Sequence, residues 1–557
     1  MTLLPLLMLL LIALVISSFI SRVLPAAVPR PLVQIAMGAL IGISPTLRIA
    51  LDPELFFLLF IPPLLFFDGW RIPNKDLLED RAINLQLALG LVFLTVLGIG
   101  WFVHWLIPGI PLSVAFAFAA VVSPTDAISV ASTIDNLPLP RRSLRILTSE
   151  SLLNDATGLV CLRFAVAATL TGTFSFSTVL LNFIWIAAGG IVIGLLSALI
   201  IARACNWLTL RVGEEPGVQV VISLLIPFIA YSLAEAARCS GILAAVCAGL
   251  AMSYVEADGK GLAATRVQRT SVWETIHFTI NGMVFVMLGE QLPQLMAAAD
   301  SALYAVGERH LRWGIAYVLV IYVALLLIRG LWLLVVLPRE VLWPEQPNSW
   351  RPWRRSSWQG QPLQPDSLRQ WAAMTVGSPR GAITLAGAMT LPYALPNGAA
   401  FPGRDVVILL AMGIILVSLI ATGLALPVLL REAKPAVTTD GEEENLARVF
   451  SARAALNAIA RMERDLKMKG EYNDTHGDAL AELQQLYSTV IEDQSRSGLD
   501  AEQGRVSASI EKDLRVAVIK AERDAIFELL RAERINSEVA DKLVRELDLL
   551  QTHHDEK

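Results

Sequence analysis

Charged residues are scarce in this chain: Asp, Glu, Lys and Arg make up 17% of its 557 residues. Hydrophobic residues make up 55%, and the mean hydropathy is +0.57. This balance excludes an ordinary soluble globular protein. Basic residues are not in excess either, since the formal net charge is −5. The composition therefore argues against a nucleic-acid partner.

Cysteine and the usual processing and cofactor signals are also largely missing. The first 20 residues lack the basic segment and cleavage site of a secretory signal, so they predict a membrane span that is retained. The charged C-terminal region has no glycine-rich phosphate loop and no zinc spacing. We therefore expect no resident cofactor. The four cysteines lie in or beside apolar stretches and are interpreted as small buried hydrophobic residues: Cys161, Cys205, Cys239 and Cys247.

Long apolar stretches dominate residues 1–431, whereas residues 432–557 are charged and show amphipathic helical patterns. The sequence therefore predicts an all-α membrane protein, with a transmembrane domain (1–431) and a helical cytoplasmic regulatory tail (432–557). A stretch must cross about 30 Å of hydrocarbon. By this criterion we expect about thirteen transmembrane helices, at residues 3–20, 31–47, 54–69, 82–107, 112–133, 144–171, 176–202, 217–235, 239–255, 271–292, 313–337, 371–393 and 405–430.

The placement of Lys and Arg predicts the orientation. An odd number of spans puts the two ends of the chain on opposite sides of the membrane. If the tail is cytoplasmic, every cytoplasmic loop carries Lys or Arg, as the positive-inside rule expects. Two outside loops, near Pro108–Pro111 and Thr171–Thr173, carry no charge. We expect a multi-pass protein of the plasma (inner) membrane, with its N-terminus outside.

Two of the spans are interrupted by the same pattern, S-P-x-x-A-I, at Ser123–Ile128 and Ser378–Ile383. Proline removes a backbone donor and clashes with the preceding turn, so each helix should break there. Broken backbone at membrane depth is tolerated only where it is buried in protein or lines a cavity. Because the two spans run in opposite directions, the pattern predicts two inverted repeats whose broken crossing helices form a transport site.

The sixth span opens with a polar stretch, Thr148–Gly158. On a helix, Glu150, Ser151, Asn154 and Asp155 share one face. A charged residue at the bilayer centre costs about 2.5–3.5 kcal/mol, so these acids need partners or a function.

Asp126, Asp155 and Arg380 all fall near the middle of their spans. We expect Arg380 to pair with Glu150, which leaves Asp155 and Asp126 for transported ions. A dehydrated carboxylate can hold either a proton or a small cation. Oxygen ligands suit a hard cation, and Ser151 and the carbonyls freed near Thr125 would supplement the two carboxylates.

Three motifs stand out: T-D in a broken span, E-S-L-L-N-D in the next, and G-x-x-R-G at Gly377–Gly381. Together they resemble those of NhaP-type bacterial sodium–proton antiporters, relatives of the NHE exchangers in the cation–proton antiporter superfamily. The resemblance covers about residues 1–430. It implies a thirteen-span fold, a homodimer formed through a scaffold, and a mobile core domain that contains both broken helices.

The same resemblance implies that Asp155 binds the ion and the proton, preceded by Asn154 as in electroneutral members. It also implies that Thr125, Asp126 and Ser151 help to ligate Na⁺, and that Glu150 pairs with Arg380. The sequence departs from the pattern at two positions. Ala127 stands where many members have proline, so the break depends on Pro124. Asp68 stands where members often have Glu, and we place it on a possible access path.

These observations predict an electroneutral Na⁺/H⁺ antiporter, with Li⁺ as a surrogate, that serves pH homeostasis and is not an enzyme. K⁺/H⁺ exchange on the same scaffold is the nearest alternative, because the ligand types do not separate Na⁺ from K⁺. An intramembrane aspartyl protease with Asp126 and Asp155 as its dyad is a remote alternative. Arg380 and the paired broken helices would have no role in such a protease.

Overall fold

The computed structural model divides the chain into two compact units, Met1–Ala436 and Val437–Lys557. Their boundary lies close to the expected one at 431/432. The cytoplasmic and regulatory assignment of the tail stays a prediction. The structure describes residues 3–25, 28–44, 53–71, 81–126, 141–171, 176–257, 263–305, 311–336, 365–396, 398–431 and 440–469, and short pieces between 476 and 526.

The described residues form helices and no β-strand, which confirms the all-α fold class. Each of the thirteen expected ranges contains helix. In the first unit the helices are α1 (Leu3–Val23), α2 (Arg30–Gly42), α3 (Pro53–Arg71), α5 (Arg81–Leu85), η2 (Gln86–Leu91), α6 (Val92–Leu106), α7 (Leu112–Val122), α9 (Arg141–Thr171), α10 (Phe176–Val212), α11 (Pro216–Ala236), α12 (Gly241–Ala257), α13 (Ala263–Ala305), α14 (Leu311–Val336), α16 (Pro365–Val376), α17 (Ala382–Met389) and α18 (Arg404–Leu430). The described part of the second unit contains α19 (Asp440–Lys469).

Six stretches of described helix are long and apolar enough to cross a bilayer: Ala82–Leu106, Ser143–Thr171, Trp185–Val212, Pro216–Ala236, Arg312–Val336 and Arg404–Leu430. Four apolar helical stretches are shorter: Leu7–Val23, Arg30–Gly42, Leu112–Val122 and Gly241–Glu256. A short apolar helix fits a chain whose spans are interrupted or flanked by polar residues. The count of thirteen spans and the inverted repeats stay predictions.

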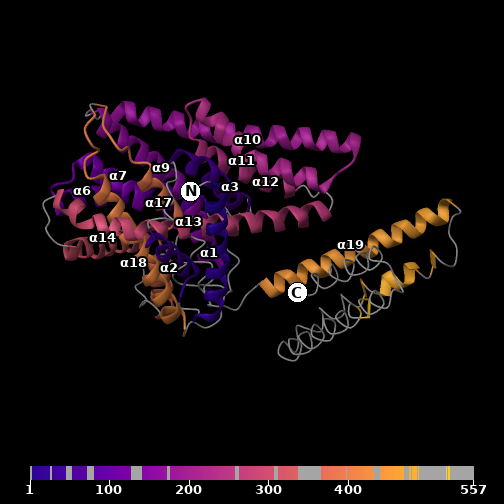
Figure 1. Cartoon of the computed structure of the whole chain (residues 1–557). Coiled ribbons are helices and arrows are strands. Elements are labelled where there is room, and N and C mark those ends of the chain that lie inside the picture. The colour runs from indigo at the N-terminus through magenta and orange to yellow at the C-terminus, as the bar shows by residue number, and fades with distance from the viewer. Residues whose placement is uncertain are drawn as a thin grey trace, which may run out of the picture. The chain divides into compact units, whose positions relative to one another are not determined.

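The helices of the first unit pack as two bundles (Figure 1). The first bundle comprises α1, α2, α3 and α10 to α13. The second comprises α5, η2, α6, α7, α9, α14 and α16 to α18. The bundles meet where α3 and α12 contact α9, and where α13 contacts α17 and α18. Both interrupted spans therefore belong to the second bundle and lie close to the first.

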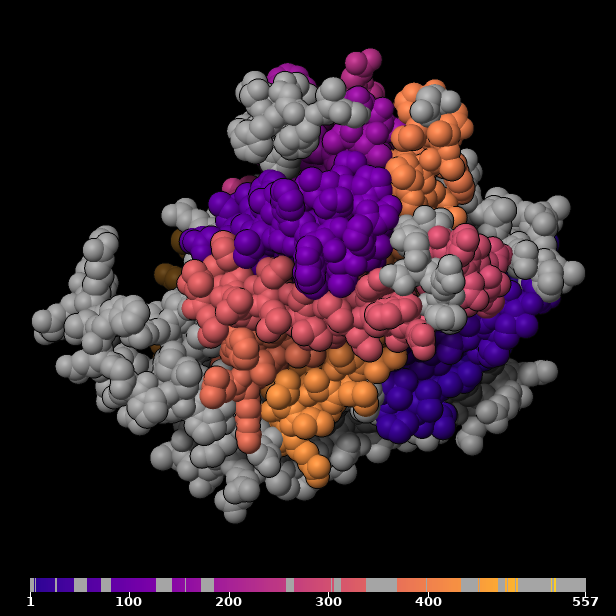
Figure 2. Space-filling view, turned by 90° about the vertical axis from the view of Figure 1, so that its left-hand side faces the viewer, coloured from indigo at the N-terminus to yellow at the C-terminus, as the bar shows by residue number. Residues whose placement is uncertain are grey.

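Helix α14 shows how the second bundle faces its surroundings. Figure 2 shows it lying across one face of the molecule, beside α6 and α18, both of which it contacts. Its outward side chains are almost all apolar, which suits contact with lipid tails. They are Trp313, Ile315, Leu319, Val320, Val323, Leu327, Leu331, Leu334 and Val335.

The fourth expected span is one continuous helix that contains a π-helical turn. The turn, η2, lies between α5 and α6. Trp332 of α14 packs there and donates from its Nε1 to the carbonyl of Gln86 at 3.2 Å. A Cβ on Gly90 would lie 2.6 Å from the Trp332 ring, so this residue must stay small. The π turn thus accommodates the Trp332 side chain of the neighbouring helix α14.

Glycines let α2 and α13 approach each other closely in the first bundle. A Cβ on Gly289 of α13 would overlap the carbonyl oxygen of Ile35 on α2, whose carbonyl carbon lies 2.7 Å away. Gly38 and Gly42 of α2 face the α13 backbone in the same way. Small residues at such contacts bring backbones together, which is how membrane helices gain packing energy without a hydrophobic driving force.

We expect Gly289→Ala to destabilise the protein by about 1–3 kcal/mol, because the added methyl group meets backbone atoms that cannot rotate away. Gly217→Ala is the matched control, since a Cβ at Gly217 of α11 meets nothing within 4 Å. The control should be unchanged or gain up to about 1 kcal/mol from its better helix propensity. Thermal unfolding in detergent measures both. Equal midpoints for the two variants would show that the α2–α13 contact is loose.

Candidate functional site

Both S-P motifs lie where helices end. Helix α7 ends at Val122, and Ser123 to Asp126 are not helical. In the twelfth expected span, α16 ends at Val376, and α17 begins at Ala382 after five non-helical residues. The breaks expected at these prolines are therefore present. The rest of the fifth expected span, 127–133, lies outside the described residues.

The two breaks cross and hydrogen-bond to each other. The backbone N–H of Asp126 donates to the carbonyl of Pro379 at 2.7 Å. Arg380, only 3% exposed, donates from Nε to the carbonyl of Val122 at 2.9 Å and from Nη1 to the carbonyl of Ser378 at 2.6 Å. These bonds satisfy carbonyls that an unbroken helix would have paired internally. A Cβ on Gly381 would lie 2.6 Å from that of Asp126, so glycine is needed at the crossing.

The polar face of α9 holds the first break from the other side. Ser151 donates from Oγ to the carbonyl of Thr125 at 2.6 Å. Asn154 donates from Nδ2 to the Thr125 hydroxyl at 2.8 Å, and its Oδ1 accepts from the Thr125 N–H at 3.5 Å. The structure thus brings together all the expected cation-site residues on α9 and the first break. It also shows that Asn154 fixes the backbone of Thr125, a contact that the sequence alone does not specify.

Asp155 comes directly after Asn154 in α9 but, unlike Ser151 and Asn154, does not hydrogen-bond to the first break. It is 6% exposed, and its carboxylate makes no hydrogen bond or ion pair with any residue that the structure describes. The ionisable groups that act on it electrostatically are two further acids, Asp126 and Asp68. A buried acid flanked by acids requires a positive occupant, either a proton or a cation.

In the described part of the chain, no three His, Cys, Asp or Glu side chains converge as a metal site. An ion at Asp155 would therefore need hydroxyl, carbonyl or water oxygens in addition to carboxylates. The Na⁺ ligands Asp155, Asp126 and Ser151 stay a prediction.

Asp68 reaches the site from the first bundle. It lies near the end of α3, and its Oδ1 is 3.3 Å from Nε2 of His277 on α13. The side chain of Asp68 is 28% exposed, against 8% for His277. An acid that is partly exposed and electrostatically coupled to Asp155 fits the expected access path, although its role stays a prediction.

The expected ion pair between Glu150 and Arg380 is wrong, because the structure pairs Glu150 with Arg329 of α14. Arg329 donates from Nη2 to Glu150 Oε2 at 2.8 Å and from Nη1 to Oε1, and both residues are at most 2% exposed. Its Nε donates to the carbonyl of Met374 at 3.1 Å. Arg380 was a candidate partner because it falls near the middle of its expected membrane span. The one arginine in the middle of the span at 313–337 was an equally available signal, since buried charges need partners.

Arg163, two turns beyond Asp155, links the two bundles. Its Nη2 lies 2.7 Å from Oε1 of Glu235 on α11, and both side chains are partly exposed. The same Glu235 oxygen accepts from the backbone N–H of Gly241. Exposed ion pairs contribute little stability, so this contact positions α9 against α11 more than it holds the fold together.

A family model described as sodium/hydrogen exchanger, transmembrane, matches residues 7–432. The chain belongs to the sodium/hydrogen exchanger family. Members of this family are membrane-embedded transporters of monovalent cations and protons, not enzymes. The resemblance inferred from the three motifs is thereby confirmed.

Similar proteins and structures agree with this assignment. The chain is 36% identical to "Uncharacterized Na(+)/H(+) exchanger YjcE" of Escherichia coli, over 96% of each chain. It is 35% identical to "Sodium, potassium, lithium and rubidium/H(+) antiporter" of Bacillus pumilus, over 97% of this chain and 77% of that one. The structure of the sodium proton antiporter MjNhaP1 from Methanocaldococcus jannaschii aligns with a TM-score of 0.55 and 17% identity. This alignment covers 78% of the present chain and 99% of MjNhaP1, and shows a shared fold.

Proposed function

We propose that this exchanger carries one Na⁺ or Li⁺ in exchange for one proton, and that both compete for Asp155. The observation that supports this most directly is the Asp155 carboxylate, which is buried and has no partner among the described residues. An acid in that setting can accept a proton or an alkali cation, but not both at once. Exchange then follows if the site opens to only one side of the membrane at a time.

Electroneutrality is supported by the state of the neighbouring polar groups. Glu150 is neutralised by Arg329, so it is not available to carry a second proton. Asn154 has no charge, and its amide is engaged with Thr125. With Asp126 keeping its charge throughout the cycle, Asp155 exchanges one cation for one proton, and no net charge moves.

The packing of the bundles supports alternating access. The second bundle carries both breaks and Asp155, while Asp68 and His277 belong to the first bundle. Movement of the second bundle against the first would expose Asp155 to either side of the membrane in turn. We further propose that the first bundle forms the interface of a homodimer in the inner membrane, with the tail on the cytoplasmic side and the N-terminus outside.

K⁺/H⁺ exchange is a second candidate, and the comparisons favour testing it. The relatives from Bacillus pumilus and Bacillus subtilis, 35% and 34% identical, are both named as sodium, potassium, lithium and rubidium/H⁺ antiporters. The oxygen ligands proposed here coordinate Na⁺ and K⁺ alike. Selectivity between Na⁺ and K⁺ then depends on the size of the site when the ion is bound.

The decisive experiment measures cation-induced recovery of a quenched pH dye in proteoliposomes, with Na⁺, Li⁺, K⁺ and Rb⁺ compared. We expect Na⁺ and Li⁺ to move protons, and their initial rates to be unaffected by an imposed potential. A potential would add about 2.3 kcal/mol per net charge per 100 mV, so even partial electrogenicity is readily detected. A strong dependence on voltage would refute one-for-one exchange. Proton movement with K⁺ alone would replace Na⁺ by K⁺ as the substrate.

A further inference from the structure

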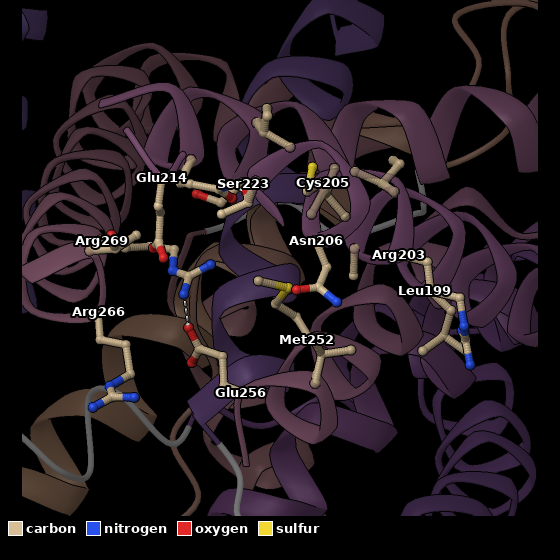
Figure 3. Close-up of a pocket in the computed structure, with 18 of the residues that line it drawn as sticks. Leu199, Arg203, Cys205, Asn206, Glu214, Ser223, Met252, Glu256, Arg266 and Arg269 are labelled. Carbon is tan, nitrogen blue, oxygen red and sulfur yellow. Dashed lines mark hydrogen bonds and ion pairs between the residues drawn. The ribbon is translucent and has the colours of Figure 1, made fainter. Parts of the chain in front are cut away.

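A cavity lies in the first bundle, apart from Asp155. Its volume is about 450 Å³, within the range of small-molecule sites, and residues of α10, α11, α12 and α13 line it. Figure 3 shows the side chains of its three arginines and two glutamates around the cavity. The residues important here are Arg203, Glu214, Glu256, Thr265, Arg266 and Arg269.

Two buried donors of this lining have no acceptor among the described residues. They are the Oγ1 hydroxyl of Thr265, a residue 2% exposed, and the Nε–H of Arg269, a residue 7% exposed. Arg269 uses another nitrogen, Nη2, for an ion pair with Glu256 Oε1 at 2.5 Å (Figure 3). Leaving a buried donor unsatisfied costs about 1–3 kcal/mol, so two of them in one cavity indicate a missing acceptor.

The charges of the lining indicate that this acceptor is an anion. Three arginines and two glutamates line the cavity. Glu256 forms an ion pair with Arg269, and its Oε2 accepts from the Trp70 indole N–H at 2.7 Å. Thr265 and Arg266 lie in the first turn of α13, where the helix dipole also favours a negative charge. The arginines of the lining therefore outnumber its glutamates by one.

We propose that this cavity binds a phosphate group, carried by an anionic phospholipid headgroup or present as inorganic phosphate. Phosphate oxygens accept hydrogen bonds from guanidinium and hydroxyl donors, which are the groups left without partners here. The arginines of the cavity lie in α10 and α13, just outside the spans expected at 176–202 and 271–292, on the side expected to be cytoplasmic and at the level of the headgroups. Basic pockets between membrane helices at this level suit lipid phosphates.

A phosphate bound in this cavity would influence the transport site through α3. Trp70, which donates to Glu256, lies two residues after Asp68 on the same helix. Its ring is also 6.3 Å, centroid to centroid, from that of Trp273, one turn before His277 on α13. A phosphate that orders the Glu256–Arg269 pair would therefore also order the end of α3 that presents Asp68.

The test uses the purified full-length protein in an uncharged detergent. Thermal unfolding is followed against three additives: inorganic phosphate, micelles containing phosphatidylglycerol, and micelles containing phosphatidylcholine. The variants are Thr265→Val and Arg269→Lys. Thr265→Val removes only the hydroxyl, and Arg269→Lys keeps the charge that faces Glu256 while removing the Nε donor. Thr384→Val is the matched control, because its buried hydroxyl also has no partner in the described structure but does not line this cavity.

We expect phosphatidylglycerol to raise the wild-type midpoint by about 2 °C or more, and phosphatidylcholine not to raise it. Thr265→Val and Arg269→Lys should need about tenfold more ligand for the same shift, and Thr384→Val should behave as wild type. Without ligand, Thr265→Val should be at least as stable as wild type, since an unsatisfied buried hydroxyl is gone.

Stabilisation by phosphatidylglycerol alone assigns the site to a lipid headgroup, and stabilisation by inorganic phosphate as well shows that the phosphate group suffices. The proposal is overturned if neither ligand stabilises the wild type. It is equally overturned if Thr265→Val and Arg269→Lys respond as the wild type does.

Discussion

Asp155→Asn should abolish cation-driven proton movement, leaving only the leak of protein-free vesicles. Asparagine keeps the size and the hydrogen-bonding capacity of the side chain but can neither bind a proton nor neutralise a cation. The same change should leave the thermal midpoint equal or higher, because it removes a buried carboxylate that lacks a partner in the described structure. Loss of activity together with maintained stability separates a role in transport from a role in folding.

The matched control is Asp405→Asn in the first turn of α18. Its carboxylate is 72% exposed and lies 3.7 Å from Arg404, so its removal should change neither transport nor stability appreciably. Proteoliposome transport and thermal unfolding are measured on the same preparations. Exchange retained by Asp155→Asn would contradict the proposed site, whereas exchange lost in both variants would point to a general effect of charge.

Arg329→Gln should destabilise the protein by about 3–5 kcal/mol, because it leaves Glu150 buried without its bidentate partner. It also removes the bond to Met374, which ties α14 to α16. The double variant Glu150→Gln, Arg329→Gln should be more stable than the sum of the single changes predicts, since the buried carboxylate is gone as well. Unfolding in detergent gives the coupling energy of the pair.

A second cycle, with Glu150→Gln and Arg380→Gln, serves as the comparison. Arg380 donates to the carbonyls of Val122 and Ser378, not to Glu150, so its coupling to Glu150 should be the smaller of the two. A larger coupling of Glu150 with Arg380 than with Arg329 would restore the pairing expected from the sequence. Additivity in both cycles would show that neither arginine neutralises Glu150.

Local features of the chain were predictable because they depend on residues that are adjacent in sequence. Hydrophobic runs mark helices, and the structure has helix in every expected range. Proline ends helices through its missing N–H, and both helices end at the S-P motifs. The common face of Ser151, Asn154 and Asp155 follows from helix periodicity alone.

Contacts between distant segments were predicted less well. Depth in the membrane suggested Arg380 as the partner of Glu150, but many residues lie at the same depth. Only the packing of α14 against its neighbours brings Arg329 to Glu150. The bond between Asn154 and Thr125 and the cavity around Arg269 were missed for the same reason. Each depends on how the helices are rotated against one another in the folded chain.

By itself, the sequence determined an all-helical membrane protein of the exchanger family with two interrupted spans and an acid at position 155, because hydrophobicity, proline and helix periodicity act locally. The tertiary structure alone decided which arginine neutralises Glu150, that Asp155 is buried without a protein partner in the described structure, and where the cavity around Arg269 lies. Charge pairing acts over a few ångströms in space, and the fold, rather than the order of residues, sets those distances.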